Sequence, residues 1–233
     1  MLKARCPRRL PFAARQKHDW ASLDRATHLR SASDALAELR ARDDCRHVVC
    51  HRGSVLFEGA KDDGTLALAS LGARALAGVL GDEGAPTCSF LGLCGARRAP
   101  VFVADVSSAG GAPAAARDLL DLRLHVPFLD DDEAAVALYA HGLATWQRRS
   151  GFCAACGAHA ALDLGGHARV CSACGAQAFP RQDPAMIVLV SSPDNRACLL
   201  GRQARYPPKV HSTLAGFVEV TARTREAAGR SRG

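Results

Sequence analysis

The chain has 233 residues, of which 48% are hydrophobic and 23% are charged, a composition that excludes a wholly disordered protein. No apolar run approaches the roughly 18–20 residues that a membrane-spanning helix needs, so we expect no membrane partner. The net charge is +7 and is concentrated at the ends, because six Lys and Arg precede Asp19 and residues 220–233 carry four Arg and one Glu. The basic charge is therefore weak evidence for a nucleic-acid-binding surface.

The cysteine content indicates a reducing compartment. Ten cysteines occur without an apolar secretory signal, and four of them form two tight pairs, which favours metal binding over disulfides. We therefore expect an intracellular protein. The acid-free, Arg-rich start is typical of organellar transit peptides, and a frayed basic N-terminus fits it equally well. Cytoplasmic, peroxisomal and organellar locations (mitochondrion or plastid) all stay open.

The first 125 residues are expected to form an α+β domain without an identifiable chemical motif. Ser31 followed by Asp34 resembles a capping box and predicts a helix over Ser31–Arg42. The β-rich segments of this region are His47–Cys50 and Ser54–Glu58, joined by a hairpin turn at Arg52-Gly53, and Val101–Val106; a breaker follows at Gly110–Pro113.

A longer amphipathic helix follows an acidic cluster, Asp130–Glu133. The cluster is interpreted as decorating the positive N-terminus of that helix, although a metal site is an alternative. Arg148 and Arg149 lie in the predicted last turn, and Gly151 is a stop signal. The apolar stripe recurs at intervals of three, four and three residues, at Val136, Tyr139, Leu143 and Trp146.

Two CxxCG motifs are the strongest signal in the sequence. Cys153, Cys156, Cys171 and Cys174 are predicted to bind one zinc ion, with a strand, a Gly165-Gly166 turn and a second strand between the pairs. Four thiolates complete a tetrahedral shell and leave His159 and His167 no vacancy, so the site should be structural. A redox CxxC and an iron–sulfur cluster are weaker alternatives. The remaining cysteines are expected to be buried or free thiols: Cys6, Cys45, Cys50, Cys88, Cys94 and Cys198.

A β-rich segment follows the second pair of cysteines. We expect a strand over Met186–Val190, a turn over Ser192–Arg196 and a returning strand over Ala197–Leu200. The next strand, Ser212–Glu219, should be broken by Gly216, since glycine within a strand often marks a bulge or a place where a ligand approaches the backbone.

The order CxxCG, CxxCG, FPRQDPAMIVLV, LLGRQARYPP, HSTLAGFVE resembles the NADH pyrophosphatases, which are Nudix hydrolases with a zinc ribbon. The resemblance is weak over residues 1–140 and strong from Phe152 to Glu219. It implies an α+β fold: an N-terminal α+β domain, a zinc ribbon, and the first strands of an incomplete Nudix α/β/α sandwich. It also implies hydrolysis of NAD⁺ or NADH to AMP and nicotinamide mononucleotide, with NAD-capped RNA as a substrate of some members. Complete members usually form homodimers.

The resemblance also implies roles for individual residues. Phe179 and Phe217 match aromatic residues that lie near the substrate. Ala215 matches an alanine whose carbonyl reaches the catalytic Mg²⁺ or Mn²⁺ in complete family members. Gly166 stands where a substrate-contacting Glu is often found, so that contact is not expected here.

The sequence departs from the family in the Nudix box, whose glutamates hold the catalytic cations. With the box anchored on Gly216, Ala222 and Ser231 stand where two glutamates belong, while the final Glu pair would fall beyond Gly233. A shifted alignment on Glu226 does not restore the cluster. We therefore expect no catalytic residue, a chain truncated within the box by a gene-model error or a retained intron, and no activity in this chain.

The main interpretation is an NAD(H) diphosphatase by family; the alternatives are a non-catalytic zinc-ribbon module that binds nucleotide or RNA, and a non-functional fragment. The expected segments are 1–20, basic and disordered or targeting; 21–130, the N-terminal domain; 131–180, helix plus zinc ribbon; 181–219, the partial Nudix domain; and 220–233, an atypical basic tail.

Overall fold

The computed structural model describes residues 20–60, 66–80, 85–107 and 118–219. The basic N-terminal segment, the breaker Gly110–Pro113 and the tail 220–233 lie outside the described residues. The chain divides into two compact units, Met1–Pro180 and Arg181–Gly233, and each is described by itself. Within the described part of the chain, no helix combines the length and the hydrophobicity needed to cross a membrane.

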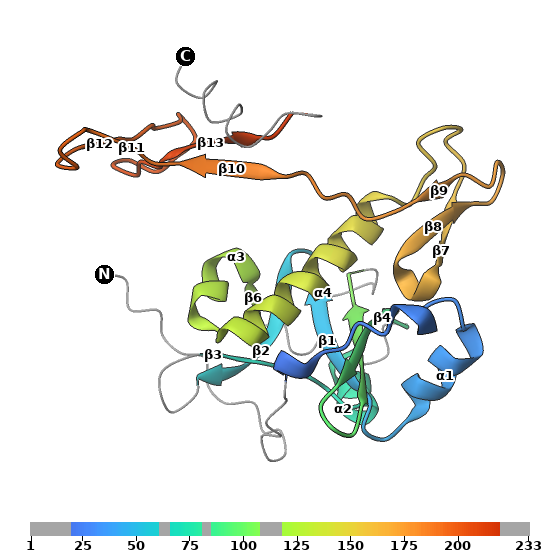
Figure 1. Ribbon diagram of the computed structural model, residues 1–233. Helices are drawn as coiled ribbons and strands as arrows, with labels where there is room; N and C mark the ends of the chain where they lie inside the picture. The colour runs from blue at the N-terminus through green and yellow to red at the C-terminus, as the bar shows by residue number, and fades with distance from the viewer. Residues whose placement is uncertain (1–19, 61–65, 81–84, 108–117, 220–233) are drawn as a thin grey trace. The chain divides into compact units, whose positions relative to one another are not determined.

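The first unit is built on a six-stranded mixed sheet (Figure 1). Its strand order is β3-β2-β1-β5-β4, with β6 also paired to β2. Strands β1 and β5 run parallel, while the other pairs are antiparallel. The strands are β1 (Arg46–His51), β2 (Ser54–Ala60), β3 (Leu66–Leu68), β4 (Thr87–Cys94), β5 (Ala99–Asp105) and β6 (Leu119–Asp121). The hairpin turn predicted at Arg52-Gly53 is confirmed by the pairing of Cys50 with Val55.

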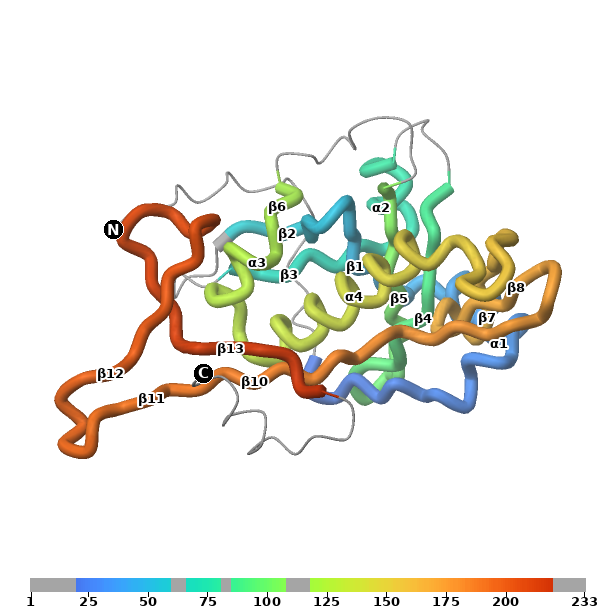
Figure 2. The backbone as a smooth tube through the Cα atoms, turned by 90° about the horizontal axis from the view of Figure 1, so that it is seen from above, coloured from blue at the N-terminus to red at the C-terminus, as the bar shows by residue number. Residues whose placement is uncertain are grey.

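Helices cover both faces of this sheet (Figure 2). Side chains alternate along a strand, so Val48 packs on one face with α4, whereas Val49 packs on the other with α2. The α-helices are α1 (Ser33–Ala41), α2 (Ala73–Leu80), α3 (Leu122–His125) and α4 (Asp131–Arg149). Short 3₁₀ helices occupy Trp20–Ser22, Thr27–Leu29 and Val126–Phe128.

Helix α4 agrees with the prediction made from the sequence. The Asp130 carboxylate accepts a hydrogen bond from the Glu133 N–H at 2.9 Å, so the acidic cluster caps the helix. Arg148 and Arg149 lie in the last turn, as predicted. The prediction for α1 was wrong at its start: that helix begins at Ser33, and Ala32, which has no capping side chain, occupies the N-cap position assigned to Ser31.

The ribbon follows α4 directly and forms a three-stranded antiparallel sheet, in the order β7-β8-β9. Its strands are β7 (Ala160–Asp163), β8 (Ala168–Cys171) and β9 (Gln177–Ala178), and the 3₁₀ turn Leu164–Gly166 joins the first two. The strand, turn and strand predicted between the cysteine pairs are therefore confirmed.

The second unit contains two short antiparallel strand pairs. They are β10 (Ala185–Val188) with β13 (Leu214–Phe217), and β11 (Val190–Ser191) with β12 (Cys198–Leu199). Gly216 pairs with Met186 in an unbroken register, so the predicted break at that glycine was wrong. Ile187 and Phe217 are each 75% exposed, so this small sheet leaves an apolar surface uncovered within the unit.

Candidate functional site

The two CxxCG motifs fold into turns of the same backbone conformation. The N–H of Gly157 donates to the carbonyl of Cys153 at 2.9 Å, and the N–H of Gly175 donates to that of Cys171 at 3.1 Å. Both glycines have positive φ values, 77° and 72°, in the region that side-chain-bearing residues rarely adopt. Glycine after each cysteine pair is therefore a requirement of the turn.

The turns bring four thiols together. The Sγ atoms of Cys153, Cys156, Cys171 and Cys174 all lie within 4.8 Å of one another. The Sγ–Sγ distance is 3.7 Å for Cys153–Cys174, 3.5 Å for Cys156–Cys171 and 3.6 Å for Cys156–Cys174. A tetrahedral ion with Zn–S bonds of about 2.3 Å holds its sulfur atoms about 3.8 Å apart. The donor set and its spacing thus fit zinc.

The backbone of each turn favours the thiolate form that a metal needs. The N–H groups of Cys174 and Ala173 point at the sulfur of Cys171, at 3.5 and 3.4 Å, and lower its pKa to about 6. Backbone donors, first that of Cys156, likewise lower the pKa of Cys153. Cys156 also accepts from the backbone N–H of Ala158, but its hydrogen bonds with Cys171 and Cys174 outweigh that contact and raise its pKa to about 12. The thiolate form is therefore favoured at Cys153 and Cys171, and four thiolates around one ion leave no ligand position for water.

The two histidines near the ribbon do not belong to the metal-ligand group. His167 is buried, and its Nε2 donates to the backbone carbonyl of Phe90 at 2.7 Å. Burial lowers the pKa of His167 to about 4. His159 makes an isolated bridge with Phe152 beside the first turn. His167 therefore joins the ribbon to the sheet of the first unit.

The surroundings of Gly166 leave no space for a glutamate side chain at that position. The φ of Gly166 is 93°, and a Cβ there would overlap the side chain of Ser89. The Nε2 atom of Gln147 donates both to the Gly166 carbonyl, at 2.7 Å, and to the Ser89 hydroxyl, at 2.8 Å. The ribbon turn thus packs directly against β4, and this close approach requires glycine.

Arg169 makes a second connection between the ribbon and α4. Its guanidinium donates to the carbonyl of Gln147 at 2.7 Å and to the carbonyl of Ala160. Burial lowers the pKa of Arg169. The sequence reading missed Gln147, His167 and Arg169 as ribbon contacts. A usable signal was the position of Gln147 on the buried stripe of α4, four residues after Leu143, because a polar side chain in such a stripe needs a partner.

The residues that resemble substrate contacts lie in different units. Phe179 directly follows β9, the last strand of the ribbon, in the first unit, and its exposed fraction is 54%. In the second unit, Ala215 of β13 pairs with Ile187 of β10. Phe217 lies two residues further along β13, on the same face of the strand. Ala222, Glu226 and Ser231 lie outside the described residues. Among the described residues, the four cysteines are the only group of three or more that could hold a metal ion.

Comparison with protein families supports two adjoining modules. Residues 45–146 match the NADH pyrophosphatase-like rudimentary NUDIX domain, and residues 148–179 match the NADH pyrophosphatase zinc ribbon domain. Together the two matches span more than half of the 233 residues.

Curated relatives align over about half of this chain. The chain is 42% identical over 132 residues to the NAD-capped RNA hydrolase NudC of Deinococcus radiodurans, covering 55% of this chain and 45% of the relative. It is 38% identical over 109 residues to the human NAD-capped RNA hydrolase NUDT12, covering 41% and 24%. It is 36% identical over 130 residues to the chloroplastic Nudix hydrolase 19 of Arabidopsis thaliana, covering 54% and 30%.

The aligned part spans less than half of the length of each of these relatives. Its two matched modules nevertheless occur in the same order as the sheet domain and the four-thiol ribbon of the structure. The chain belongs to the NADH pyrophosphatase family of zinc-ribbon Nudix hydrolases.

Proposed function

We propose that the protein is an NAD(H) diphosphatase that cleaves the dinucleotide diphosphate to AMP and nicotinamide mononucleotide. The observation that supports this proposal is that the sheet domain and the ribbon match two NADH pyrophosphatase modules, which adjoin each other over residues 45–179. NAD-capped RNA is a second proposed substrate, supported by the similarity to relatives named NAD-capped RNA hydrolases. Phe179 and Phe217 are the proposed substrate contacts, and their exposed rings support this role.

In this proposal the four cysteines hold one structural zinc ion. The 3.5–3.7 Å spacing of the sulfurs supports it. The ion would close the ribbon on itself and supply folding free energy locally. It would take no part in hydrolysis, because four thiolates leave no open coordination position.

Hydrolysis of a diphosphate requires a second kind of cation site, built from carboxylates that hold Mg²⁺ or Mn²⁺. In the described residues after Gly216, Glu219 is the only carboxylate, and Ala215 offers a backbone carbonyl alone. These two groups do not make a magnesium site. We propose that a polypeptide of these 233 residues hydrolyses NADH negligibly.

The test compares two polypeptides under the same conditions. One has the 233 residues given, and the other continues after Glu219 with a complete Nudix box. Both are loaded with zinc, supplied with Mg²⁺ or Mn²⁺, and assayed by chromatography for AMP and nicotinamide mononucleotide released from NADH. A third polypeptide, in which the glutamates of the restored box are replaced by glutamine, controls for contaminating hydrolases.

We expect product only from the polypeptide with the complete box. Comparable turnover by the 233-residue chain would contradict its proposed inactivity. Absence of turnover from the zinc-loaded, box-complete polypeptide would contradict the proposed diphosphatase function.

The second candidate function is a non-catalytic module that binds nucleotide or RNA. One observation favours it: two arginines, Arg148 and Arg169, line a cavity beside the ribbon. Binding of NADH without turnover by the box-complete polypeptide would favour this function over hydrolysis.

A further inference from the structure

A cavity of about 550 Å³ lies where the sheet, helix α4 and the ribbon meet within the first unit. Its volume falls in the range of about 300–1,000 Å³ that is usual for small-molecule sites. Each of the three elements contributes to the wall: Thr87 and Asp105 from the sheet, Gln147 and Arg148 from α4, and Ala161 and Arg169 from the ribbon.

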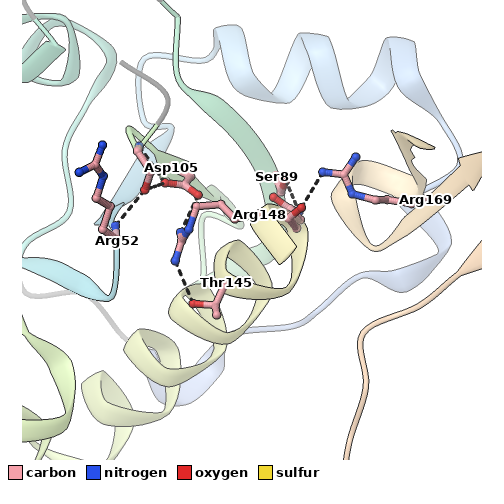
Figure 3. Close-up of polar contacts among 8 residues, drawn as sticks. Arg52, Ser89, Asp105, Thr145, Arg148 and Arg169 are labelled. Carbon is pink, nitrogen blue, oxygen red and sulfur yellow. Dashed lines mark hydrogen bonds and ion pairs between the residues drawn. The ribbon is translucent and has the colours of Figure 1, made fainter. Parts of the chain in front are cut away.

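The cavity wall carries more positive than negative charge. Arg148 donates to the Asp105 carboxylate at 2.8 Å and to the Thr145 hydroxyl at 3.2 Å (Figure 3). Arg169 donates to backbone carbonyls, and no carboxylate of the described residues forms an ion pair with it. One guanidinium is thus neutralised and the other is not, so the cavity favours an anion.

Each of the two guanidinium groups has more N–H donors than its contacts use. A guanidinium has five N–H groups in a planar fork, and the contacts of Arg148 and Arg169 occupy two on each. Planar forks of this kind match the oxygens of a phosphate group, and they bind it through paired hydrogen bonds. The hydroxyl of Thr87 adds a further neutral donor on the sheet side of the cavity.

Gln147 gives a second, independent indication of a ligand. The residue is 3% exposed, and its Nε2 atom is fully used by Ser89 and Gly166. Its Oε1 atom is buried and has no hydrogen-bond partner. An unpaired buried acceptor is costly, and a hydroxyl or amino group of a ligand in the cavity would satisfy it after a small movement of the side chain.

We propose that this cavity binds a nucleoside monophosphate. The phosphate would lie between Arg148 and Arg169, and a donor of the ribose or the base would reach Gln147. The cavity is larger than a phosphate alone fills, and Ala161 and Leu162 provide an apolar wall for the nucleoside. The site is separate from the zinc centre, and the proposal does not rest on the proposed hydrolase activity.

The first experiment is calorimetric titration of the zinc-loaded 233-residue chain with AMP, adenosine and inorganic phosphate. We expect AMP to bind with a Kd of about 1 mM or tighter. Adenosine lacks the anion and inorganic phosphate lacks the nucleoside, so each should bind at least roughly tenfold more weakly than AMP. Equal binding of AMP and adenosine, or no binding of AMP at about 10 mM, would overturn the proposal.

The second experiment places the ligand. Ala161 is exposed, so Ala161→Glu should fold while adding a carboxylate to the cavity. It should weaken AMP binding by roughly tenfold or more. Leu138→Glu adds the same charge at a residue of α4 that is 52% exposed and should leave AMP binding within about twofold. Equal effects of the two substitutions would count against the site.

Amide chemical shifts of the unaltered chain give a test that needs no variant. AMP should shift the resonances of Arg148, Ala161 and Arg169, which line this cavity and not the control cavity described next. The control is the neighbouring cavity at the start of α1, which is lined by Ser33 and Ala37 and should show no shifts. Shifts confined to that second cavity would overturn the assignment even if AMP binds. Because none of these three experiments measures turnover, their outcomes are independent of whether NADH is hydrolysed.

Discussion

The side-chain amide of Gln147 donates a hydrogen bond of 2.7 Å to the carbonyl of Gly166, and this bond joins helix α4 to the turn of the ribbon. The same amide bonds the Ser89 hydroxyl of β4, so one side chain connects three elements. The ribbon is therefore fixed to the sheet domain through the backbone of its turn.

Replacing Gly166 should loosen this junction. In Gly166→Ala, the added Cβ overlaps Ser89, and the residue must keep a positive φ. We expect the free energy of unfolding to fall by about 1–3 kcal/mol, measured by urea denaturation. Gly142→Ala is the matched control, because Gly142 lies on α4 and a Cβ added there has no neighbouring atom within 4 Å. It should be neutral or stabilising by up to about 1 kcal/mol; equal losses would contradict the packing argument.

The ion pair between Asp105 and Arg148 should matter for stability. The Asp105 side chain is 6% exposed and that of Arg148 is 28% exposed, with 2.8 Å between nitrogen and oxygen. Arg148→Met leaves the carboxylate nearly buried beside an apolar chain, and should cost about 1–3 kcal/mol in the free energy of unfolding.

The control for that ion pair is exposed. Arg98 and Asp24 lie 2.9 Å apart with side chains 54% and 49% exposed. Arg98→Met should therefore cost less than about 1 kcal/mol, because water screens the pair. A similar loss in Arg148→Met and Arg98→Met would show that burial of Asp105 does not set the contribution.

Acid should weaken the junction through His167. Burial, assisted by the nearby charges of Arg30 and Arg25, lowers the pKa of His167 to about 4, against about 6.5 in an unfolded chain. Between these values the unfolded chain binds more protons than the folded one. The stabilisation is thus present above pH ~6.5 and is lost as the pH falls towards ~4.

This pH dependence has a direct test. His167→Gln preserves a donor for the Phe90 carbonyl but cannot titrate, so its stability should change less over that interval, by on the order of 1–3 kcal/mol. Denaturation at a series of pH values would measure the difference, with zinc content determined in each sample. Parallel pH profiles for the two proteins would rule out His167 as the cause.

Zinc should bind at one equivalent per chain under reducing conditions. Cys171→Ser removes a buried ligand and should lower both zinc content and ribbon stability, since the ion supplies folding free energy. Cys198→Ser changes an exposed thiol outside the group and should retain the metal. Elemental analysis and thermal melting would measure both effects, and zinc-free protein from the unaltered chain would refute the assignment.

Local spacing was sufficient for several features of this protein. The CxxCG repeats predicted the four-thiol group, because a turn of fixed geometry places its two sulfurs together. The stripe from Val136 to Trp146 and the acidic cap predicted α4, since both depend on residues within a few turns. The start of α1 was not predicted correctly, because Ser31 offered a cap that the backbone does not use.

Long-range contacts decided the rest. The sequence marked Gly166 as a turn residue and as the place of a missing Glu, whereas the structure shows that Ser89, far away in sequence, excludes a side chain there. Gln147, Arg148 and Arg169 carry no motif, and they line one cavity only because α4 and the ribbon pack on the same sheet. Sequence by itself determined the metal ligands, whose geometry is local. Only the tertiary structure decided which polar groups meet across elements, because their separation in space depends on the packing of the whole unit.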